Sequence, residues 1–194
     1  MRSFFYFFLL AMILATVPGC GYNKIQTNDE AVTASWADVQ AAYQRRADLI
    51  PNLVETVKAY AAHEKETLIA VTEARAKVGQ IRLGSDVIND PKAMANFQNA
   101  QSGLTSALSR LMVVAERYPD LKANQSFRDF QHQLEGTENR INVARVRYNE
   151  AVRIFNTSIR TFPNNLTNKF LLQLPRRTPF KAEEGAQAAP KVKF

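Results

Sequence analysis

Apolar residues recur along most of the chain at alternating steps of three and four, and polar residues fill the positions between them. Such steps keep one face of an α-helix apolar, so the pattern predicts amphipathic helices that pack against one another. The first apolar seam follows Asp29 and reaches Val78, with interruptions at Arg46, Glu64 and Thr67. Its apolar members are Val32, Trp36, Val39, Tyr43, Ile50, Leu53, Val57, Tyr60, Val71, Ala74 and Val78.

Pro51 lies in the middle of this first seam. Proline removes a backbone donor and clashes with the preceding turn, so it kinks or ends a helix. The seam keeps its register across Pro51 without a glycine or serine loop. This favours one kinked helix of about fifty residues, capped by Thr27 or Asn28. The alternative is that Pro51 opens a second helix at its first position. The two possibilities predict three and four long helices, respectively.

Two more seams follow in the second half of the chain. Pro91 opens the second helix of this pattern, and Pro119 ends it. Asn124 or Ser126 begins the last long helix, and Pro163 stops it. The predicted fold class is all-α, an antiparallel up-and-down bundle of three to four long helices. The residues predicted to form its core are Trp36, Phe97, Leu104, Leu108, Leu134 and Ile141.

Residues 1–20 are expected to be a targeting segment. Arg2 supplies a positive start, and an apolar run extends from Phe4 to Val17. A small residue directly before Cys20, after a short apolar run, is typical of a bacterial lipoprotein signal, which is cleaved before the cysteine. Acyl chains on Cys20 would then anchor the chain in a bilayer.

Two other interpretations of this leader stay open. No charge occurs between Arg2 and Lys24, and the 21 residues between them come close to the ~20 that span a bilayer as a helix. Pro18 and Gly19 lie inside that stretch and count against a spanning helix. The alternatives to a lipoprotein are therefore an uncleaved transmembrane helix and full secretion. All three export the rest of the chain across the inner membrane.

Composition and charge narrow the class of function. Cys20 is the only cysteine, so neither an intramolecular disulfide nor a cysteine-based metal site is possible. The net charge of +7 suits anionic partners, but the charges alternate in sign, as on a solvated helical surface. The basic residues also lack the interleaved aromatic residues of a nucleic-acid binder. We therefore expect no nucleic-acid partner, no metal and no other cofactor.

Two clusters resemble catalytic sites but do not meet the requirements of one. The sequence from His63 to Thr67 begins like a zinc-protease helix and lacks the second histidine four residues on. Glu135, Glu138 and Glu150 stand among arginines on the last helix, where spacings of three and four favour intrahelical ion pairs. No catalytic residue is predicted, and we do not expect an enzyme.

A polar cluster around Pro51 is the candidate docking site for a partner. It consists of Arg45, Arg46, Asp48 and Asn52. The structural alternative is that a proline kink frees backbone carbonyls, which an arginine or Asn52 could satisfy.

The chain changes character after Pro163. Residues 164–194 hold three prolines and six Lys or Arg against two Glu, a net charge of +4. The predicted domains are a targeting segment (1–20), a helical bundle (21–163) and an extended basic C-terminal tail (164–194), in which residues 169–174 could add a short helix. Three long helices, the favoured number, would place this tail far from the anchor as a distal arm for a partner. Four would return it to the membrane. The basic residues of the distal arm are Arg176, Arg177, Lys181, Lys191 and Lys193.

One set of stretches is spread over most of the chain after the leader. It consists of residues 21–23, Trp36, residues 45–60, 63–66, 71–75, 118–124, 137–141, 145–149, 155–156, 162–163 and 189–194. Through these stretches the chain resembles the LemA family of bacterial envelope proteins. The resemblance implies a membrane-anchored, all-α antiparallel bundle and assigns no catalytic residue. Many members carry a transmembrane N-terminus, so the cysteine at position 20 departs from the family pattern.

Two functions of different classes fit this sequence. The favoured one is an anchored interaction or scaffold module of the cell envelope, facing the periplasm or the cell exterior. Its partners would be the lipid bilayer, through acylated Cys20 or a transmembrane N-terminus, and an unknown envelope protein. The alternative is an accessory or unconventional enzyme subunit of an envelope hydrolase or protease complex. A pocket that gathers ionisable side chains of shifted pKa would favour that alternative.

Overall fold

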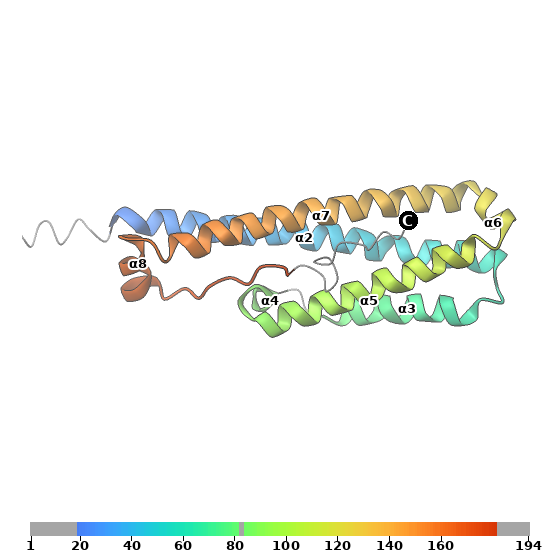
Figure 1. Cartoon of the computed structure of the whole chain (residues 1–194), viewed down its shortest axis with the longest axis horizontal. Coiled ribbons are helices and arrows are strands. Elements are labelled where there is room, and N and C mark those ends of the chain that lie inside the picture. The colour runs from blue at the N-terminus through green and yellow to red at the C-terminus, as the bar shows by residue number, and fades with distance from the viewer. Residues whose placement is uncertain (1–18, 82–83, 182–194) are drawn as a thin grey trace, which may run out of the picture.

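The computed structural model describes residues 19–81 and 84–181 (Figure 1). Within these ranges the chain is helical and contains no strand. The predicted targeting segment lies outside the described residues up to position 18, as does the end of the chain from position 182. The helices are α2 (Gly19–Tyr60), α3 (Lys65–Gln80), α4 (Ser85–Asn89), α5 (Pro91–Ala115), α6 (Pro119–Ala123), α7 (Gln125–Ser158), α8 (Asn164–Thr167) and the π-helical turn η1 (Asn168–Leu172).

The long helices α2, α3, α5 and α7 run antiparallel along one elongated bundle (Figure 1). α2 packs along α7, and α3 packs along α5. α6 lies at one end of the bundle, beside the turn between α2 and α3. α8 lies at the other end, beside the start of α2 (Figure 1). The predicted all-α class is confirmed. α2 continues through Pro51, as the favoured interpretation predicted, but it ends at Tyr60, so four long helices form without the helix start at Pro51 that the alternative required.

The chain first turns after Tyr60 and not at Pro51, which lies inside α2. The next four residues form a turn without glycine or proline. The Glu64 carboxylate holds this turn, because it accepts hydrogen bonds from Arg117 at 3.0 Å and from the Tyr118 hydroxyl at 3.1 Å. The favoured single helix through this region is therefore wrong. A contact with a distant part of the chain ends the helix where no local signal does.

Arg75 compensates for the backbone donor that Pro51 lacks. In a regular helix the amide of residue 51 would bond the carbonyl of Ala47. Here the Arg75 Nε of α3 donates to that carbonyl at 2.9 Å. A freed carbonyl was expected at this position, but its donor comes from the neighbouring helix and not from the polar cluster around the proline.

The core consists of two clusters that follow one another along the bundle. The first is aromatic, and its Trp36 ring lies 5.6 Å from that of Phe97 and 5.4 Å from that of Tyr148. The second is largely aliphatic. All six predicted core residues are buried, which confirms the predicted helix faces. Tyr60 is an exception on the first seam, since it is exposed and Ala61 is buried instead.

The start of α2 lies earlier in the chain than expected. The predicted first helix begins near Asp29, whereas α2 begins at Gly19. Ile25 is fully buried. A Cβ at Gly21 would collide with the side chain of Asn164 and come within 3.1 Å of its Cα. The apolar face therefore extends toward the N-terminus because α8, from the other end of the chain, covers it.

Local signals account for the starts of α5 and α7. The Asp90 side chain caps α5 by accepting from the Lys92 amide at 2.8 Å, and Asn124 caps α7 by accepting from the Phe127 amide at 3.0 Å. Both starts agree with the prediction. The predicted helix ends are wrong. α5 ends at Ala115, and Pro119 instead opens α6, while α7 ends at Ser158, before Pro163.

After η1 the chain folds back onto the bundle as residues 173–181, which we name the C-terminal strap. Its Phe180 side chain is buried in the aromatic cluster around Trp36. The Tyr148 hydroxyl of α7 donates to the Thr178 carbonyl oxygen at 2.8 Å. The described part of the expected tail is therefore a packed element of the fold and not an extended one.

An ion pair brings the strap close to the beginning of α2. The Arg177 Nη2 lies 2.7 Å from the Asp29 Oδ1. The strap therefore lies toward the end of the bundle at which α2 begins. The distal arm is wrong for its described members, which are Arg176, Arg177 and Lys181. Its other two residues lie outside the described part of the chain.

Candidate functional site

Arg46 is the polar centre of the bundle. Its side chain is 2% exposed on a helix face that is otherwise apolar. Its Nη1 donates to the Glu138 carboxylate of α7 at 2.6 Å and to the Thr105 hydroxyl of α5 at 3.0 Å. Its Nη2 donates to the side-chain oxygen of Gln101, also on α5. One guanidinium therefore links three helices and fixes their register.

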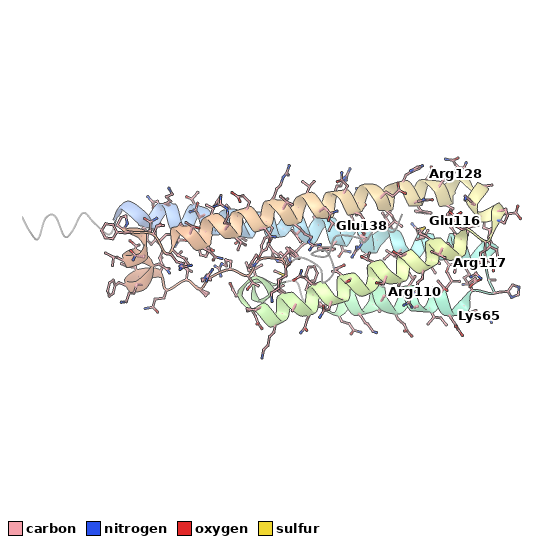
Figure 2. All side chains as sticks on the ribbon, viewed as in Figure 1. Lys65, Arg110, Glu116, Arg117, Arg128 and Glu138 are labelled. Carbon is pink, nitrogen blue, oxygen red and sulfur yellow. The ribbon has the colours of Figure 1, made fainter. Side chains whose placement is uncertain are left out.

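A polar groove of about 540 Å³ opens above this network, between α2, α5 and α7. Glu138 reaches it from near the middle of the bundle (Figure 2), and its side chain is 41% exposed. The Arg46 Nε and the Gln101 Nε2 are buried, and neither has a hydrogen-bond partner within residues 19–81 and 84–181. Most buried donors in folded proteins are hydrogen-bonded, so these two atoms mark the part of the network that is not satisfied within the described bundle.

The structure separates the four residues of the predicted docking cluster. Arg46 is buried, whereas Arg45, Asp48 and Asn52 are exposed. Arg45 and Asp48 line a second groove of about 840 Å³ between α2 and α7. Asn52 lines neither groove, and its carbonyl accepts from the Thr56 hydroxyl at 2.8 Å. Two of the four residues thus share one surface.

The second groove, named here the α2–α7 groove, combines an apolar floor with a charged rim. Leu49 and Ala144 are at least partly buried in the floor, and Val143 is exposed beside them. Within the rim, the Gln44 amide donates to the Asp48 carboxylate at 2.7 Å. An apolar centre within a polar rim is the usual anatomy of a protein–protein interface. The charged residues of the rim are Asp38, Arg45, Asp48, Arg140 and Arg147.

The three carboxylates considered on α7 have different partners. Glu150 pairs with Arg153 at 2.6 Å within the helix, as predicted. The Glu135 Oε2 lies 3.8 Å from the His132 Nδ1, also within the helix. For Glu138 the prediction of an intrahelical pair is wrong, because it pairs across the bundle. In the described ranges, no set of histidine, cysteine and carboxylate side chains is arranged to hold a metal ion.

Packing and ion pairing explain the shifted pKa values. Burial raises the pKa of Tyr148 in the aromatic cluster. Desolvation, followed by the hydrogen bond to Glu64, raises the pKa of Tyr118. The hydrogen bonds from Arg153 lower the pKa of Glu150. Tyr118 lies directly before α6, at the other end of the bundle from α8, and on α7 Tyr148 is buried whereas Glu150 is exposed. None of the three lines any of the grooves described.

Comparison with protein families settles the ancestry of this bundle. The family model described as the LemA family matches residues 35–194. The chain belongs to the LemA family. The resemblance predicted from the sequence is confirmed. Among the described residues, no helix combines the length and the apolar character needed to cross a membrane.

Curated relatives of two kinds share the LemA-like region. Protein LemA from Metamycoplasma hominis is 27% identical over 167 residues, which cover 82% of this chain and 71% of the relative. Magnetosome protein MamQ 2 from Paramagnetospirillum magneticum is 26% identical over 160 residues, which cover 74% of this chain and 59% of the relative. MamQ from Magnetospirillum gryphiswaldense is 24% identical over 158 residues. The match thus spans about three-fifths of the length of these magnetosome proteins.

Sequence reasoning missed most of the network that Arg46 forms in this LemA-family bundle. Arg46 and Gln101 each occupy a position on an otherwise apolar seam, and this shared feature could have paired them. Thr137 stands at the corresponding kind of position on the seam of α7 and is buried. Glu138, next to it, gave no such signal, because charged residues also occupy the solvent-facing side of α7.

Proposed function

We propose that the protein is a membrane-anchored interaction module of the bacterial cell envelope with no catalytic activity of its own. The α2–α7 groove is the observation that carries this proposal. Its apolar floor and charged rim suit a protein partner. Glu138, which lines the polar groove above Arg46 and not the α2–α7 groove, is already paired with Arg46, as suits a structural role. The alternative enzyme-subunit role has no comparable support.

Cys20 is proposed as the anchor. It lies in the first turn of α2, so acyl chains on a mature N-terminal cysteine would join the bundle to the bilayer without a linker. Globomycin, which blocks the lipoprotein signal peptidase, should make a larger precursor accumulate. Cys20→Ser, which has no thiol to acylate, should accumulate as the same uncleaved precursor. If Cys20→Ser is processed and retained like the natural chain, the transmembrane alternative replaces the lipoprotein.

Arg45 and Asp48 are proposed as partner contacts in the α2–α7 groove, where they lie opposite Arg140 and Arg147 of α7. On this view Arg46 acts only by positioning α2 against α7, and Asn52 has no part in docking. The charges of the rim would select a partner whose charges are opposite in sign at the facing positions. Like charges that face each other across an interface cost binding energy.

Site-specific photo-crosslinking in intact cells tests this role. A photo-reactive amino acid replaces Val143 in the groove or Val113, which is exposed on α5 and lines none of the grooves described. We expect a discrete protein adduct at position 143 that is absent at 113 and is lost on Arg45→Glu. Lys65→Glu, a matched charge reversal on α3, should leave the adduct unchanged. Equal adducts at both positions, or one insensitive to Arg45→Glu, contradict the proposed docking surface.

A further inference from the structure

A group of apolar side chains is exposed at the end of the bundle where α2 begins. Phe162, Leu166, Phe170 and Leu171 all project into solvent from α8, η1 and the turn before them. We name these four residues the apolar cap. Leu166 and Phe170 are four positions apart, which places them on one side of a helical segment. Large apolar groups gathered on a surface mark a contact with another molecule or with lipid.

The surroundings of the apolar cap are positively charged. The sequence contains no Asp or Glu between Glu150 and Glu183, and none before Asp29. Arg160, Lys169 and Arg176 are exposed in this region. The Lys169 Nζ lies 5.5 Å from the centre of the Phe170 ring, so a cationic and an aromatic group stand together. Apolar side chains bordered by Lys and Arg are typical of segments that lie in the interface of an anionic bilayer.

Arg160 and Arg176 also share a groove. They line an opening of about 490 Å³ between α7 and the C-terminal strap, together with Asn156 and Thr157. The position of the strap there is fixed, because the Asn156 amide donates to the Arg177 carbonyl at 2.9 Å and accepts from the Arg177 amide at 2.9 Å. Two arginines held above one groove add an anion-attracting site beside the apolar cap.

The apolar cap also lies where the leader joins the bundle. The apolar run from Phe4 to Val17 ends directly before α2. α8 contacts the first turn of that helix at Gly21, where Asn164 lies too close to admit a Cβ without a shift. Whatever fixes Cys20 to a bilayer therefore brings α8 and η1 to the same surface. Figure 1 shows α8 beside the beginning of α2, at the end of the bundle opposite α6.

We propose that the apolar cap inserts into the interface of an anionic phospholipid bilayer as a second membrane contact beside the N-terminal anchor. This inference rests on the proposed anchoring and extends it. The aromatic and leucine side chains enter the boundary of the acyl chains, and Arg160, Lys169 and Arg176 reach the phosphates. A second copy of the chain suits the cap less well, because a symmetric contact would bring the same positive charges together.

Tryptophan fluorescence in the full-length chain tests the proposal. Phe170→Trp is compared with Val113→Trp, because the two positions are almost equally exposed, at 68% and 69%. Trp36 is the only natural tryptophan, and its signal is common to both variants. Each variant is reconstituted in phosphatidylethanolamine–phosphatidylglycerol vesicles with or without acyl-chain-brominated lipid, and the bound fraction is measured by flotation. We expect bromine to quench Phe170→Trp strongly and Val113→Trp little.

The other outcomes separate the insertion from the anchoring. A chain that floats with the vesicles but is quenched equally at both positions overturns the insertion and leaves the anchor intact. A chain that does not float overturns both. Emission of Phe170→Trp that shifts to the blue with rising protein concentration, without bromine quenching, overturns the insertion and assigns the cap to a second copy.

Charge variants test whether the basic residues beside the apolar cap contribute to its insertion. Arg160→Gln with Lys169→Gln removes one arginine and one lysine beside the apolar cap. Arg110→Gln with Lys65→Gln removes the same types near the opposite end of the bundle (Figure 2). The first pair should reduce the bromine quenching of Phe170→Trp in anionic vesicles, and the second should not. Equal effects of the two pairs would show that net charge alone matters and would overturn the role of the basic residues beside the cap.

Discussion

Asp29 and Arg177, which are 148 positions apart in the chain, form a bidentate ion pair that closes the C-terminal strap onto α2. The two side chains are only 20% and 10% exposed, respectively. The Arg177 guanidinium also lies 5.3 Å from the centre of the Phe155 ring. The residue that was expected to reach out from a free arm is thus one of the most enclosed charges in the described bundle.

Removal of either partner of this pair should destabilise the fold and loosen the strap. Arg177→Met and Asp29→Asn should each lower the free energy of unfolding, and a double-mutant cycle should give a coupling of about 1.5–3 kcal/mol, because the pair is hydrogen-bonded and largely shielded from water. The exposed pair Lys58–Glu55, at 3.6 Å, is the control, with an expected coupling below about 0.5 kcal/mol. Equal coupling in the two cycles would mean that the strap is not closed in solution. Urea unfolding of the full chain measures both.

Phe180 and Phe170 should respond in opposite ways to the same substitution. Phe180→Ala removes a buried ring from the aromatic cluster and should cost about 3–5 kcal/mol of unfolding free energy. Phe170→Ala, at an exposed position, should change the unfolding free energy by less than about 0.5 kcal/mol. The ring of Trp36 lies 6.0 Å from that of Phe180, so tryptophan fluorescence follows the transition. A neutral Phe180→Ala would show that the segment is a free tail.

Arg46 and Glu138 should behave as a coupled unit. In the natural chain Glu138→Gln leaves a buried guanidinium without its counter-charge and should cost about 1–3 kcal/mol of unfolding free energy. In the Arg46→Met background that charge is absent, so the same change should be nearly neutral. Arg45→Met, on the exposed neighbour, serves as the control and should stay within about 0.5 kcal/mol. Additive effects of Glu138→Gln and Arg46→Met would rule out the pairing.

The Arg75 contact should matter only while residue 51 is a proline. Arg75→Met leaves the Ala47 carbonyl without its donor and should cost about 1 kcal/mol of unfolding free energy. Pro51→Ala restores the backbone amide that bonds this carbonyl, so the cost of Arg75→Met should shrink in that background. Lys77→Met, on the exposed side of the same helix, should have no such dependence. Thermal unfolding of these single and double variants, followed by circular dichroism, is the measurement. An unchanged cost of Arg75→Met in the Pro51→Ala chain would contradict the compensation.

The parts of the fold that the sequence predicts are those with local causes. Asp90 and Asn124 cap helices through their own side chains, and the spacing of Leu104, Leu134 and similar residues reveals the buried faces. The turn after Tyr60 lacks such a cause, because it depends on a contact between Glu64 and residues of another hairpin. Contacts of this kind connect distant parts of the chain and leave no trace in local periodicity.

The candidate site was predictable to a smaller extent. The sequence indicates Arg45 and Asp48 as docking residues because they lie close to Pro51, and the structure places both in one groove. That groove also needs α7, which the local pattern could not place beside them. Arg46 belongs to the same stretch, but it lies on the apolar seam. Its role as the link between helices is evident only from its contacts with Glu138 and Gln101.

The return of the chain to the end of the bundle at which α2 begins is tested most directly by two distances in the full-length, vesicle-bound protein. Spin labels on genetically encoded amino acids would replace Lys24 and Leu171 in one sample, and Lys24 and Ser126 in another. The 34 residues of α7 separate the two ends of the bundle by about 50 Å at ~1.5 Å per residue. Electron–electron double resonance should therefore give a much shorter distance for Lys24–Leu171 than for Lys24–Ser126. The reverse order would contradict the four-helix arrangement and, with it, the second membrane contact.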